Sequence, residues 1–328
     1  MQAIVQDRYG SAGVLEAQDV DRPTIGDDEV LVRVQAASVH LGDWILMTGT
    51  PYLMRMATGL RKPKVRVPGT DVSGTVEAVG LDVHGLRPGD EVFGWCTGGF
   101  AEYARAPEDQ FVRKPARLTF EQAAAVGVSA TTALQLLRDE GHVQPGQKVL
   151  VNGASGGVGT FAVQIAKAFG AEVTGVCSTK NVEMVRSIGV DHVIDYSNED
   201  FTKRGPRYDL ILDNVGNHSM SATRRALRPS GMLLSNGGGH SDGKLVRVIW
   251  AALVSMFVRQ QGRPSVKTQN RADLVALAEL VEAGTITPVI DGAYPLRSTP
   301  EAIGHVAAGH ARGTVVVTMG DRPLARVA

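Results

Sequence analysis

Thiols and long apolar runs are scarce in this chain of 328 residues. Only Cys96 and Cys177 are present, which excludes a disulfide framework and any zinc site built mainly from thiolates. The longest apolar stretch, 248–258, is well short of the ~18 to 20 residues that a membrane-spanning helix needs. The first ten residues, MQAIVQDRYG, carry no basic flank followed by an apolar run, so they do not resemble a secretory signal. We therefore expect a cytoplasmic protein with no membrane partner.

An excess of charge of either sign is also missing. The 34 Lys and Arg residues balance the 34 Asp and Glu residues, and this balance gives no support for binding a polyanion. We expect no nucleic-acid partner. Glycine is abundant instead: the chain has 38 glycines, about one residue in nine, whereas glycine usually makes up ~7% of residues. This excess predicts many tight turns or close approaches of the backbone to a ligand.

The chain shows two different sequence patterns, one in its first third and one after it. Up to about residue 120, short β-branched runs separated by turn residues predict a β-rich, barrel-like domain. Strands then alternate with helical patterns, which predicts βαβ units on a doubly wound parallel sheet. After a predicted helix over 271–283, two strands are expected, and this tail should rejoin the first domain. We therefore predict an α/β protein with these elements and boundaries: a helix over 121–137, tail strands over 287–290 and 314–318, a first domain of 1–122 completed by 269–328, and a second domain of 123–268.

The segment 148–178 contains the most informative motif. A β-branched strand runs into the glycine-rich turn GASGGVG, which opens a helix. Ala154, Gly156 and Gly159 occupy the three spaced positions of a dinucleotide fingerprint, with Ala in place of the first Gly. Missing side chains let the backbone approach a pyrophosphate, whose charge lies at the helix N-terminus. The alternative is a structural turn that binds nothing. The predicted cofactor turn comprises Ala154, Ser155, Gly156, Gly157, Val158 and Gly159.

The tip of the next strand distinguishes the two nicotinamide cofactors. An NAD site carries Asp or Glu there, which accepts from the ribose 2′-hydroxyl. This chain has Ser178, Thr179 and Lys180, two hydroxyls and a cation that can meet a 2′-phosphate, so we predict NADPH. The same residues can also serve as the polar N-cap of the next helix. Tyr196, at the end of the third strand, lies beside the adenosine end in this interpretation, although simple packing is the alternative.

Six segments carry a family resemblance: AASVHLGDW (36–44), PGTDVSGTVEAVG (68–80), RPGDEVFG (87–94), GFAEYA (99–104), GASGGVG (153–159) and LILDNVG (210–216). In this order they resemble the medium-chain dehydrogenase/reductase superfamily, and more narrowly its zinc-independent quinone oxidoreductase and enoyl reductase branch. The resemblance covers nearly the whole chain. It implies a GroES-like β-barrel catalytic domain and a Rossmann domain. It also implies that the nicotinamide lies near Asn214, Val215 and the turn Asn236, Gly237 and Gly238.

The resemblance raises the question of zinc, which the sister branch uses. Zinc-dependent members would carry a Cys within 38–41, Gly-His-Glu at 69–71 and another Cys near 127. This sequence has Ser-Val-His-Leu, Gly-Thr-Asp and a Gly at those places. Only His40 and Asp71 could ligate, whereas catalytic zinc usually takes three protein ligands. We therefore predict no metal site.

Without a metal, side chains must stabilise the charge that develops on a substrate oxygen and supply a proton. His40 stands where the branch usually has Asn followed by Pro, and a neutral imidazole can donate a hydrogen bond to a substrate oxygen or a cofactor ribose. A purely structural histidine is the alternative. Tyr52 lies one residue from where related enoyl reductases place a Tyr, and a role in the pocket wall is its alternative. His40 and Tyr52 are the predicted catalytic residues, and water is a further candidate proton donor.

The predicted function is zinc-independent, NADPH-dependent hydride transfer to a quinone or to the C=C bond of an α,β-unsaturated carbonyl, by a homodimer. The alternatives are an alcohol dehydrogenase or carbonyl reductase of the same superfamily, acting on an aldehyde, and a non-catalytic NADPH-binding sensor. Two segments stay open. Five cations and no acid lie between Leu53 and Val67, which suits a substrate loop, an anionic-ligand contact or a solvated loop. The apolar segment 245–258 suits a substrate pocket or a subunit contact.

Overall fold

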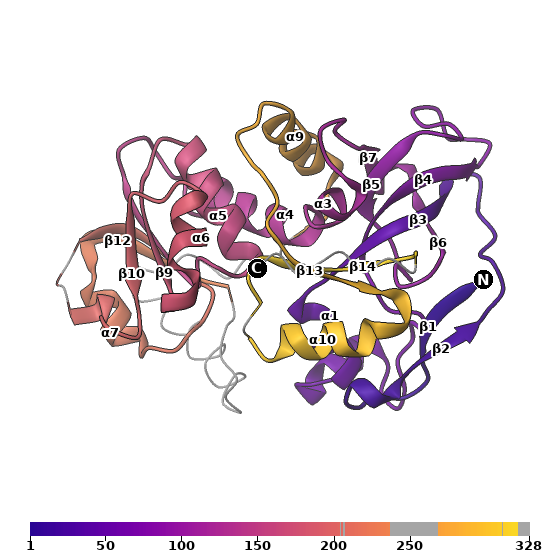
Figure 1. The fold of residues 1–328 in the computed structure, drawn as a ribbon, viewed down its shortest axis with the longest axis horizontal. Coiled ribbons are helices and arrows are strands. Elements are labelled where there is room, and N and C mark those ends of the chain that lie inside the picture. Colours follow the sequence, from indigo (N-terminus) through magenta and orange to yellow (C-terminus); the bar gives the residue numbers. More distant parts are fainter. Residues whose placement is uncertain (204, 206, 237–267, 310, 321–328) are drawn as a thin grey trace. The chain divides into compact units, whose positions relative to one another are not determined.

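The computed structural model describes residues 1–203, 205, 207–236, 268–309 and 311–320 (Figure 1). The chain forms two compact units. Unit 1 comprises Met1–Thr131 and Gln269–Ala328, and unit 2 comprises Thr132–Thr268. None of the described helices is long and apolar enough to cross a membrane. The apolar segment 245–258 lies outside the described residues.

Unit 2 is built on a five-stranded parallel sheet with the order β10-β9-β8-β11-β12. The strands are β8 (Lys148–Asn152), β9 (Glu172–Cys177), β10 (His192–Asp195), β11 (Tyr208–Asp213) and β12 (Leu227–Ser235). The chain moves outward from β8 in one direction to β9 and β10 and then in the other to β11 and β12. This confirms the predicted doubly wound sheet. The edge where strand order reverses, at the carboxyl end of β8, is where such sheets bind ligands.

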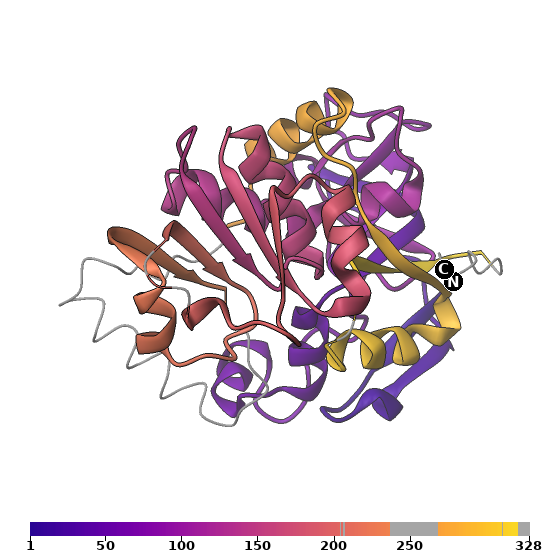
Figure 2. The ribbon, with the colours of Figure 1, turned by 60° about the vertical axis from the view of Figure 1, so that its left-hand side comes forward.

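Helices cover this sheet. They are α5 (Gly157–Ala168), α6 (Val182–Ser187) and α7 (Met220–Arg225), with short 3₁₀ turns at Thr179–Asn181 and Phe201–Lys203. Helix α5 packs on β8 and β9, α6 packs on β9 and β10, and α7 packs on β12 (Figure 2). The buried face is apolar, with Leu150, Ile194 and Ile211 in one cluster. Burial of each of these side chains stabilises the folded unit by roughly 1.5 to 3 kcal/mol.

Unit 1 contains a seven-stranded sheet with the order β13-β14-β3-β4-β5-β7, in which β6 also pairs with β3. These strands are β3 (Glu29–Val39), β4 (Asp71–Val79), β5 (Glu91–Trp95), β6 (Tyr103–Pro107), β7 (Phe111–Arg113), β13 (Ile290–Pro295) and β14 (Thr314–Thr318). A separate antiparallel pair is formed by β1 (Gln2–Gln6) and β2 (Leu15–Asp19). In β3, consecutive residues are buried over 30–32 and again over 36–39, so both faces of this central strand are largely covered.

The C-terminal tail completes unit 1. Strand β14 pairs antiparallel with β3, with Val317 opposite Ala37 (Figure 1). Helix α9 (Arg271–Glu282) is capped by Asn270, which accepts from the Asp273 amide at 2.9 Å, and α9 packs on β7. Helix α10 (Thr299–Ala307) packs on α1 (Leu41–Thr48). The other helices in the described part of the chain are α2 (Arg55–Thr58), α3 (Phe120–Ala124), α4 (Gly127–Gln135), a π-helical turn at Leu136–Glu140, and 3₁₀ turns at Ala12–Val14, Tyr52–Met54, Glu108–Gln110 and Leu296–Ser298.

The structure corrects some element predictions. The single helix predicted over 121–137 is divided into α3 and α4, because the Val128 amide at the start of α4 donates to the Asp71 carboxylate at 2.8 Å instead of continuing α3. The tail strand predicted over 287–290 begins at Ile290. Helices α1 and α10 are not among the predicted elements. The predicted helix over 271–283 and strand over 314–318 are found, as α9 and β14.

Candidate active site

The glycine turn of unit 2 connects β8 to α5, as predicted. A Cβ atom at Gly159 would overlap the Gly153 carbonyl oxygen, so glycine there lets the helix approach the strand. Gly156 is different: the nearest atom to an added Cβ is the Gly153 oxygen at 3.6 Å, and its φ of −85° suits any residue. Gly159 is therefore required by packing within the protein, whereas the space above Gly156 is open to a ligand.

The remaining parts of the turn also fit a dinucleotide. Ala154, which replaces the first fingerprint glycine, is fully buried and faces Gly175 of β9, whose missing side chain leaves room for the Ala154 methyl group. The amides in the first turn of α5, which include those of Gly157 and Val158, have no carbonyl partner within the helix and can bind an anion. Ser155 accepts a hydrogen bond from the Asn181 side chain at 3.0 Å. This link between the turn and the strand tip was not predicted from the sequence.

At the tip of β9, Lys180 and Thr179 are exposed and Ser178 is half-buried. The Thr179 hydroxyl donates to Asp195 Oδ2 at 2.6 Å, a contact that the sequence did not reveal. Hydrogen bonds from Thr179 and Ser197 lower the pKa of the Asp195 carboxyl, so it is ionised at neutral pH. The tip therefore carries a carboxylate as well as a cation. The cause is register: Asp195, the last residue of β10, lies beside Cys177, the last residue of β9.

Tyr196 follows Asp195 and lies beside the same tip. Its amide donates to the Cys177 carbonyl oxygen at 3.0 Å, and its side chain is 55% exposed. Burial raises the pKa of the Cys177 thiol to about 11, so this thiol is neutral and inert at physiological pH. The structure thus brings Tyr196 and the predicted 2′-phosphate residues to one place.

A buried carboxylate organises the end of β11. Asp213 Oδ1 accepts from the Asn152 side chain at 2.8 Å, from the Val215 amide at 3.1 Å and from the Gly216 amide at 2.8 Å. These bonds fold the chain after β11 into a tight turn directly beside the end of β8. Sequence reasoning did not single out Asp213, although it lies within the LILDNVG motif.

The side chain of Asn214 is the polar group that this turn presents. Asn214 Oδ1 accepts from the Asn236 side chain at 3.0 Å, while its Nδ2 is buried without a hydrogen-bond partner among the described residues. An unpaired buried donor is costly unless a ligand completes it. Val215 is 37% exposed. Gly237 and Gly238, the rest of the predicted nicotinamide site, lie outside the described residues.

In unit 1, His40 is the last residue before α1. Its backbone amide donates to Asp43 Oδ2 at 2.9 Å, and its Nδ1 lies 3.5 Å from the same oxygen. Its Nε2 is buried and has no hydrogen-bond partner in the part of the chain that the structure describes. The imidazole is therefore positioned from one side by Asp43 and leaves one nitrogen for another molecule. Burial raises the pKa of Asp43, although His40 opposes this shift.

Asp71 lies near His40, at the start of β4. Its Oδ2 accepts from the Ser38 hydroxyl at 2.9 Å and from the Val128 amide at 2.8 Å. Burial raises the pKa of Asp71 to about 6, and the nearby His40 limits the increase. Ser38, His40 and Asp71 thus form a buried polar group that the sequence suggested only as an incomplete metal site.

Zinc does not fit this group. Among residues 1–203, 205, 207–236, 268–309 and 311–320, no cluster of three or more His, Cys, Asp or Glu side chains could hold a metal ion. At Gly127, where zinc-dependent members would carry a Cys, an added Cβ would lie only 2.5 Å from the Asp71 carboxyl carbon. A Cys there would collide with Asp71. The two candidate ligands, His40 and Asp71, are therefore left without a third.

Tyr52 lies on the surface of unit 1 and is 72% exposed. Its ring stacks on the Arg55 guanidinium, 4.6 Å from the ring centroid, and Arg55 donates to the Gly49 carbonyl oxygen at 3.0 Å. No hydrogen bond of the Tyr52 hydroxyl is found within the described ranges. No contact within the described ranges joins Tyr52 to His40, so the structure does not bring the two predicted catalytic residues together.

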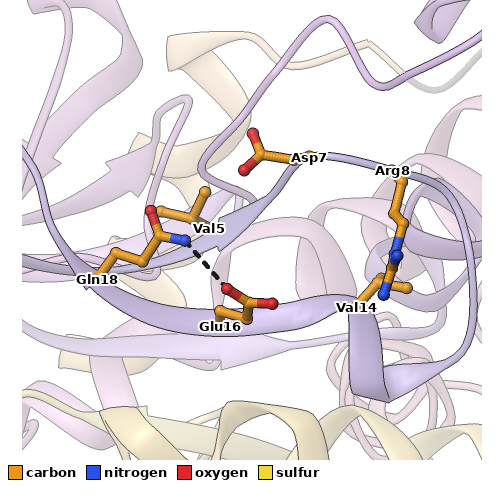
Figure 3. A pocket seen from close by; sticks show the side chains of 6 residues that line it. All are labelled: Val5, Asp7, Arg8, Val14, Glu16 and Gln18. Carbon is orange, nitrogen blue, oxygen red and sulfur yellow. Dashed lines mark hydrogen bonds between the residues drawn. The ribbon is translucent and has the colours of Figure 1, made fainter.

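A shallow pocket of about 170 Å³ lies on unit 1, beside β1 and β2 (Figure 3). Its lining residues are Val5, Asp7, Arg8, Val14, Glu16 and Gln18. The side chain of Gln18 donates to Glu16 across it at 3.2 Å. The pocket is smaller than the ~300 Å³ of ordinary ligand sites and contains none of the predicted site residues. This pocket therefore does not coincide with the predicted cofactor site.

We expect Asp71→Asn to stabilise the protein at neutral pH. The folded-state pKa of about 6 lies above the ordinary 3.8, so the native state favours the protonated form. Stability from this group is present below pH ~4 and is lost as the pH rises to ~6, which amounts to about 3 kcal/mol at ~1.4 kcal/mol per unit. Asparagine accepts the same hydrogen bonds without a charge. Urea unfolding between pH 4 and 8 should show a gain that grows through this window.

Asp90→Asn is the matched control, because hydrogen bonds from Arg113 and the Arg87 amide outweigh its partial burial and lower the pKa of Asp90. Between pH 4 and 8 its variant should be destabilised by an amount that does not change with pH, because the stabilisation from a lowered pKa is fully present above the ordinary 3.8. If Asp71→Asn is destabilised by the same amount at every pH, Asp71 contributes to stability only through its hydrogen bonds. Our explanation that its charge destabilises the folded protein is then wrong.

The comparisons with known proteins cover both units. Residues 26–116 match the family described as "Alcohol dehydrogenase GroES-like domain", and residues 188–317 match "Zinc-binding dehydrogenase". The mouse protein "NAD(P)H oxidoreductase RTN4IP1, mitochondrial" is 36% identical over 97% of this chain and 89% of its own length. The chain belongs to the medium-chain dehydrogenase/reductase superfamily. Within that superfamily it belongs to the quinone oxidoreductase branch.

Solved structures of the superfamily agree. The quinone oxidoreductase from Coxiella burnetii superposes with a TM-score of 0.85 at 28% identity, covering 98% of this chain and 99% of the other. Mycobacterial Rv1454c, solved with NADPH, gives a TM-score of 0.81 at 27% identity over 97% and 100%. These matches confirm the predicted combination of a Rossmann sheet and a GroES-like domain. With the relative above, they support an oxidoreductase of this superfamily.

Proposed function

We propose that the protein is a zinc-independent reductase that uses NADPH to reduce a quinone or the C=C bond of an α,β-unsaturated carbonyl. The observation that carries this proposal is His40, a nearly buried imidazole held by Asp43 with an unpartnered Nε2 in a group that lacks a third metal ligand. The names of the superfamily members above support the reaction class. In this proposal, residues 1–122 with 269–328 form the catalytic domain and residues 123–268 the cofactor domain.

The residues of unit 2 fit NADPH. The free amides in the first turn of α5, which include those of Gly157 and Val158, would hold the pyrophosphate, and Lys180 with Ser178 would meet the 2′-phosphate. The buried Nδ2 of Asn214 is a donor suited to the nicotinamide carboxamide, beside Val215 and Asn236. When bound, NADPH supplies the hydride.

The side chains of unit 1 would then stabilise the negative charge that develops on the substrate oxygen. His40 can donate a hydrogen bond there in the tautomer that carries its proton on Nε2, and Asp43, with Oδ2 3.5 Å from Nδ1, lies on the other side of the ring and restricts its orientation. The Tyr52 hydroxyl is a second donor and a candidate proton source, since its surface position leaves it accessible.

The direct test follows NADPH oxidation with quinones, enones and aldehydes and identifies the products. Turnover of quinones or saturation of the enone C=C bond supports the proposal. Turnover of aldehydes alone would favour a carbonyl reductase, the second candidate. Tight NADPH binding without turnover of all three classes would favour a sensor. Sedimentation of the purified protein and its location in cells test the remaining proposals, a homodimer and a cytoplasmic enzyme.

We expect NADPH to bind at least ~10-fold more tightly than NADH, on the order of 1.4 kcal/mol. Lys180→Ala should weaken the binding of NADPH much more than that of NADH, because only NADPH carries the 2′-phosphate that Lys180 would contact. Asp195→Asn should strengthen the binding of NADPH relative to NADH. It removes the carboxylate that Thr179 contacts at the same strand tip, and that negative charge would repel the 2′-phosphate. Fluorescence titrations measure both. Equal or tighter binding of NADH to the unaltered protein would contradict the assignment.

Activity should survive exhaustive chelation, because His40 and Asp71 cannot form a zinc site alone and Gly127 cannot be replaced by a ligand without a collision. Metal analysis and turnover before and after chelation measure this. Stoichiometric zinc whose removal abolishes turnover and whose return restores it would refute metal independence.

A further inference from the structure

Exposed apolar side chains are concentrated in one part of unit 1. Of the eleven large exposed apolar residues in the described chain, seven lie within residues 46–66: Leu46, Tyr52, Leu53, Met54, Met56, Leu60 and Val65. Met56 and Leu60 are 69% and 72% exposed. Scattered single exposures are normal on a protein surface, whereas a concentration of this kind marks a contact site. We call residues 46–66 the docking segment.

Internal hydrogen bonds hold this segment in place. The Tyr9 hydroxyl donates to the Gly59 carbonyl oxygen at 2.8 Å, and the Lys64 amide donates to the Thr58 carbonyl oxygen at 2.8 Å. Arg55 bonds the carbonyl oxygens of Thr48 and Gly49. These hydrogen bonds tie the backbone of the segment to unit 1, while most of its large apolar side chains are exposed. This is the reverse of an ordinary solvated loop.

Cations accompany the exposed apolar residues. Arg61, Lys62 and Lys64 are exposed and form no ion pair with any described residue. Arg66 is paired with Asp7, its Nε lying 2.8 Å from Oδ1, and this ends the segment. No Asp or Glu occurs between Leu53 and Val67. The docking segment therefore has an apolar surface with a local positive charge, although the chain as a whole is neutral.

We propose that the docking segment binds the surface of a lipid bilayer that contains anionic lipids. Apolar side chains such as Met56 and Leu60 enter the boundary between headgroups and acyl chains, and Arg61, Lys62 and Lys64 contact the anionic headgroups. A nucleic acid would match the cations but would leave the apolar side chains in water. The sequence analysis predicted no membrane partner because no apolar stretch reached the length of a bilayer span, but docking on the surface needs no span. This inference is independent of the proposed reaction.

The test is flotation of the full-length protein with vesicles of phosphatidylcholine, with and without phosphatidylglycerol, at low and high ionic strength. We expect binding to the anionic vesicles at low ionic strength and its loss in high salt. The triple variant Arg61→Ala/Lys62→Ala/Lys64→Ala should bind about 100-fold more weakly, since each cation near an anionic surface contributes about five-fold. Met56→Ser/Leu60→Ser should weaken binding at least ~10-fold.

Matched variants elsewhere separate specific docking from general effects. Arg87→Ala/Lys203→Ala/Arg297→Ala removes the same charge from other exposed sites, and Leu81→Ser removes an apolar side chain that is 86% exposed. Both controls should bind like the unaltered protein, and circular dichroism with thermal unfolding should show that every variant is folded. Absence of binding to anionic vesicles, or an equal loss in control and segment variants, would overturn the proposal. So would segment variants that change only self-association or heparin binding, which would indicate a second copy or a polyanion as the occupant.

Discussion

His40→Ala is expected to lower kcat by ~10²-fold or more while the Kd for NADPH stays near that of the unaltered enzyme. His40 Nε2 has no partner among the described residues, and the hydrogen bond it offers would form fully only as charge develops on the substrate oxygen. Loss of such a bond appears in kcat and not in cofactor binding. Stopped-flow NADPH oxidation and fluorescence titration measure the two quantities separately.

Three further variants sharpen this result. His40→Asn retains a donor and should recover part of the rate, whereas Tyr52→Phe tests the second candidate by removing one oxygen. Asp43→Asn keeps an acceptor for the His40 amide but weakens the orientation of the ring, so its kcat should fall less than that of His40→Ala. If His40→Ala raises KM and leaves kcat unchanged, His40 only shapes the pocket. Full turnover in both His40→Ala and Tyr52→Phe would leave water or a backbone amide as the donor.

Gly156→Val should weaken NADPH binding by at least ~100-fold, about 2.7 kcal/mol, and leave the fold intact. Gly156 has an extended backbone, and an added Cβ meets its nearest non-neighbouring protein atom only at 3.6 Å, so a β-carbon fits the protein itself. The side chain would instead occupy the space that a pyrophosphate needs. NADPH titration together with thermal unfolding measures both effects.

Gly159→Val provides the contrast within the same turn. Its Cβ would overlap the Gly153 carbonyl oxygen, so α5 would be forced away from β8 and the free energy of unfolding should fall by several kcal/mol. The two variants, which lie three residues apart, therefore separate an effect on NADPH binding from an effect on folding. A stable Gly159→Val protein, or a Gly156→Val protein that binds NADPH normally, would show that the turn does not work as described.

The sequence predicted those parts of the site that depend on local spacing. The glycine turn was predicted because the strand, the turn and the helix are consecutive, and the tip of β9 follows from the same unit. Asp195 was missed because its place beside Thr179 depends on the register between β9 and β10. Asn181 was missed for a similar reason, since its contact with Ser155 joins two different turns.

The sequence also did not predict the long-range polar contacts of unit 1. Asp71 was recognised only as a possible ligand, because nothing in its neighbours shows that it binds Ser38 and the Val128 amide. That second contact also divides the predicted helix over 121–137, whose apolar periodicity continues through the break. Periodicity reports which face is buried and cannot report an amide that is taken by a distant carboxylate.

The pairing of β14 with β3 determines when unit 1 can form during synthesis. Val317 and Ala37 are partners in the sheet, and every residue of unit 2 leaves the ribosome between them. Unit 2 can therefore fold first, while the edge of β3 waits with its amides and carbonyl groups unpaired. A chain that ends before Thr314 would keep that edge open permanently, so we expect nonsense mutations near the C-terminus to cause aggregation as severe as that of early ones.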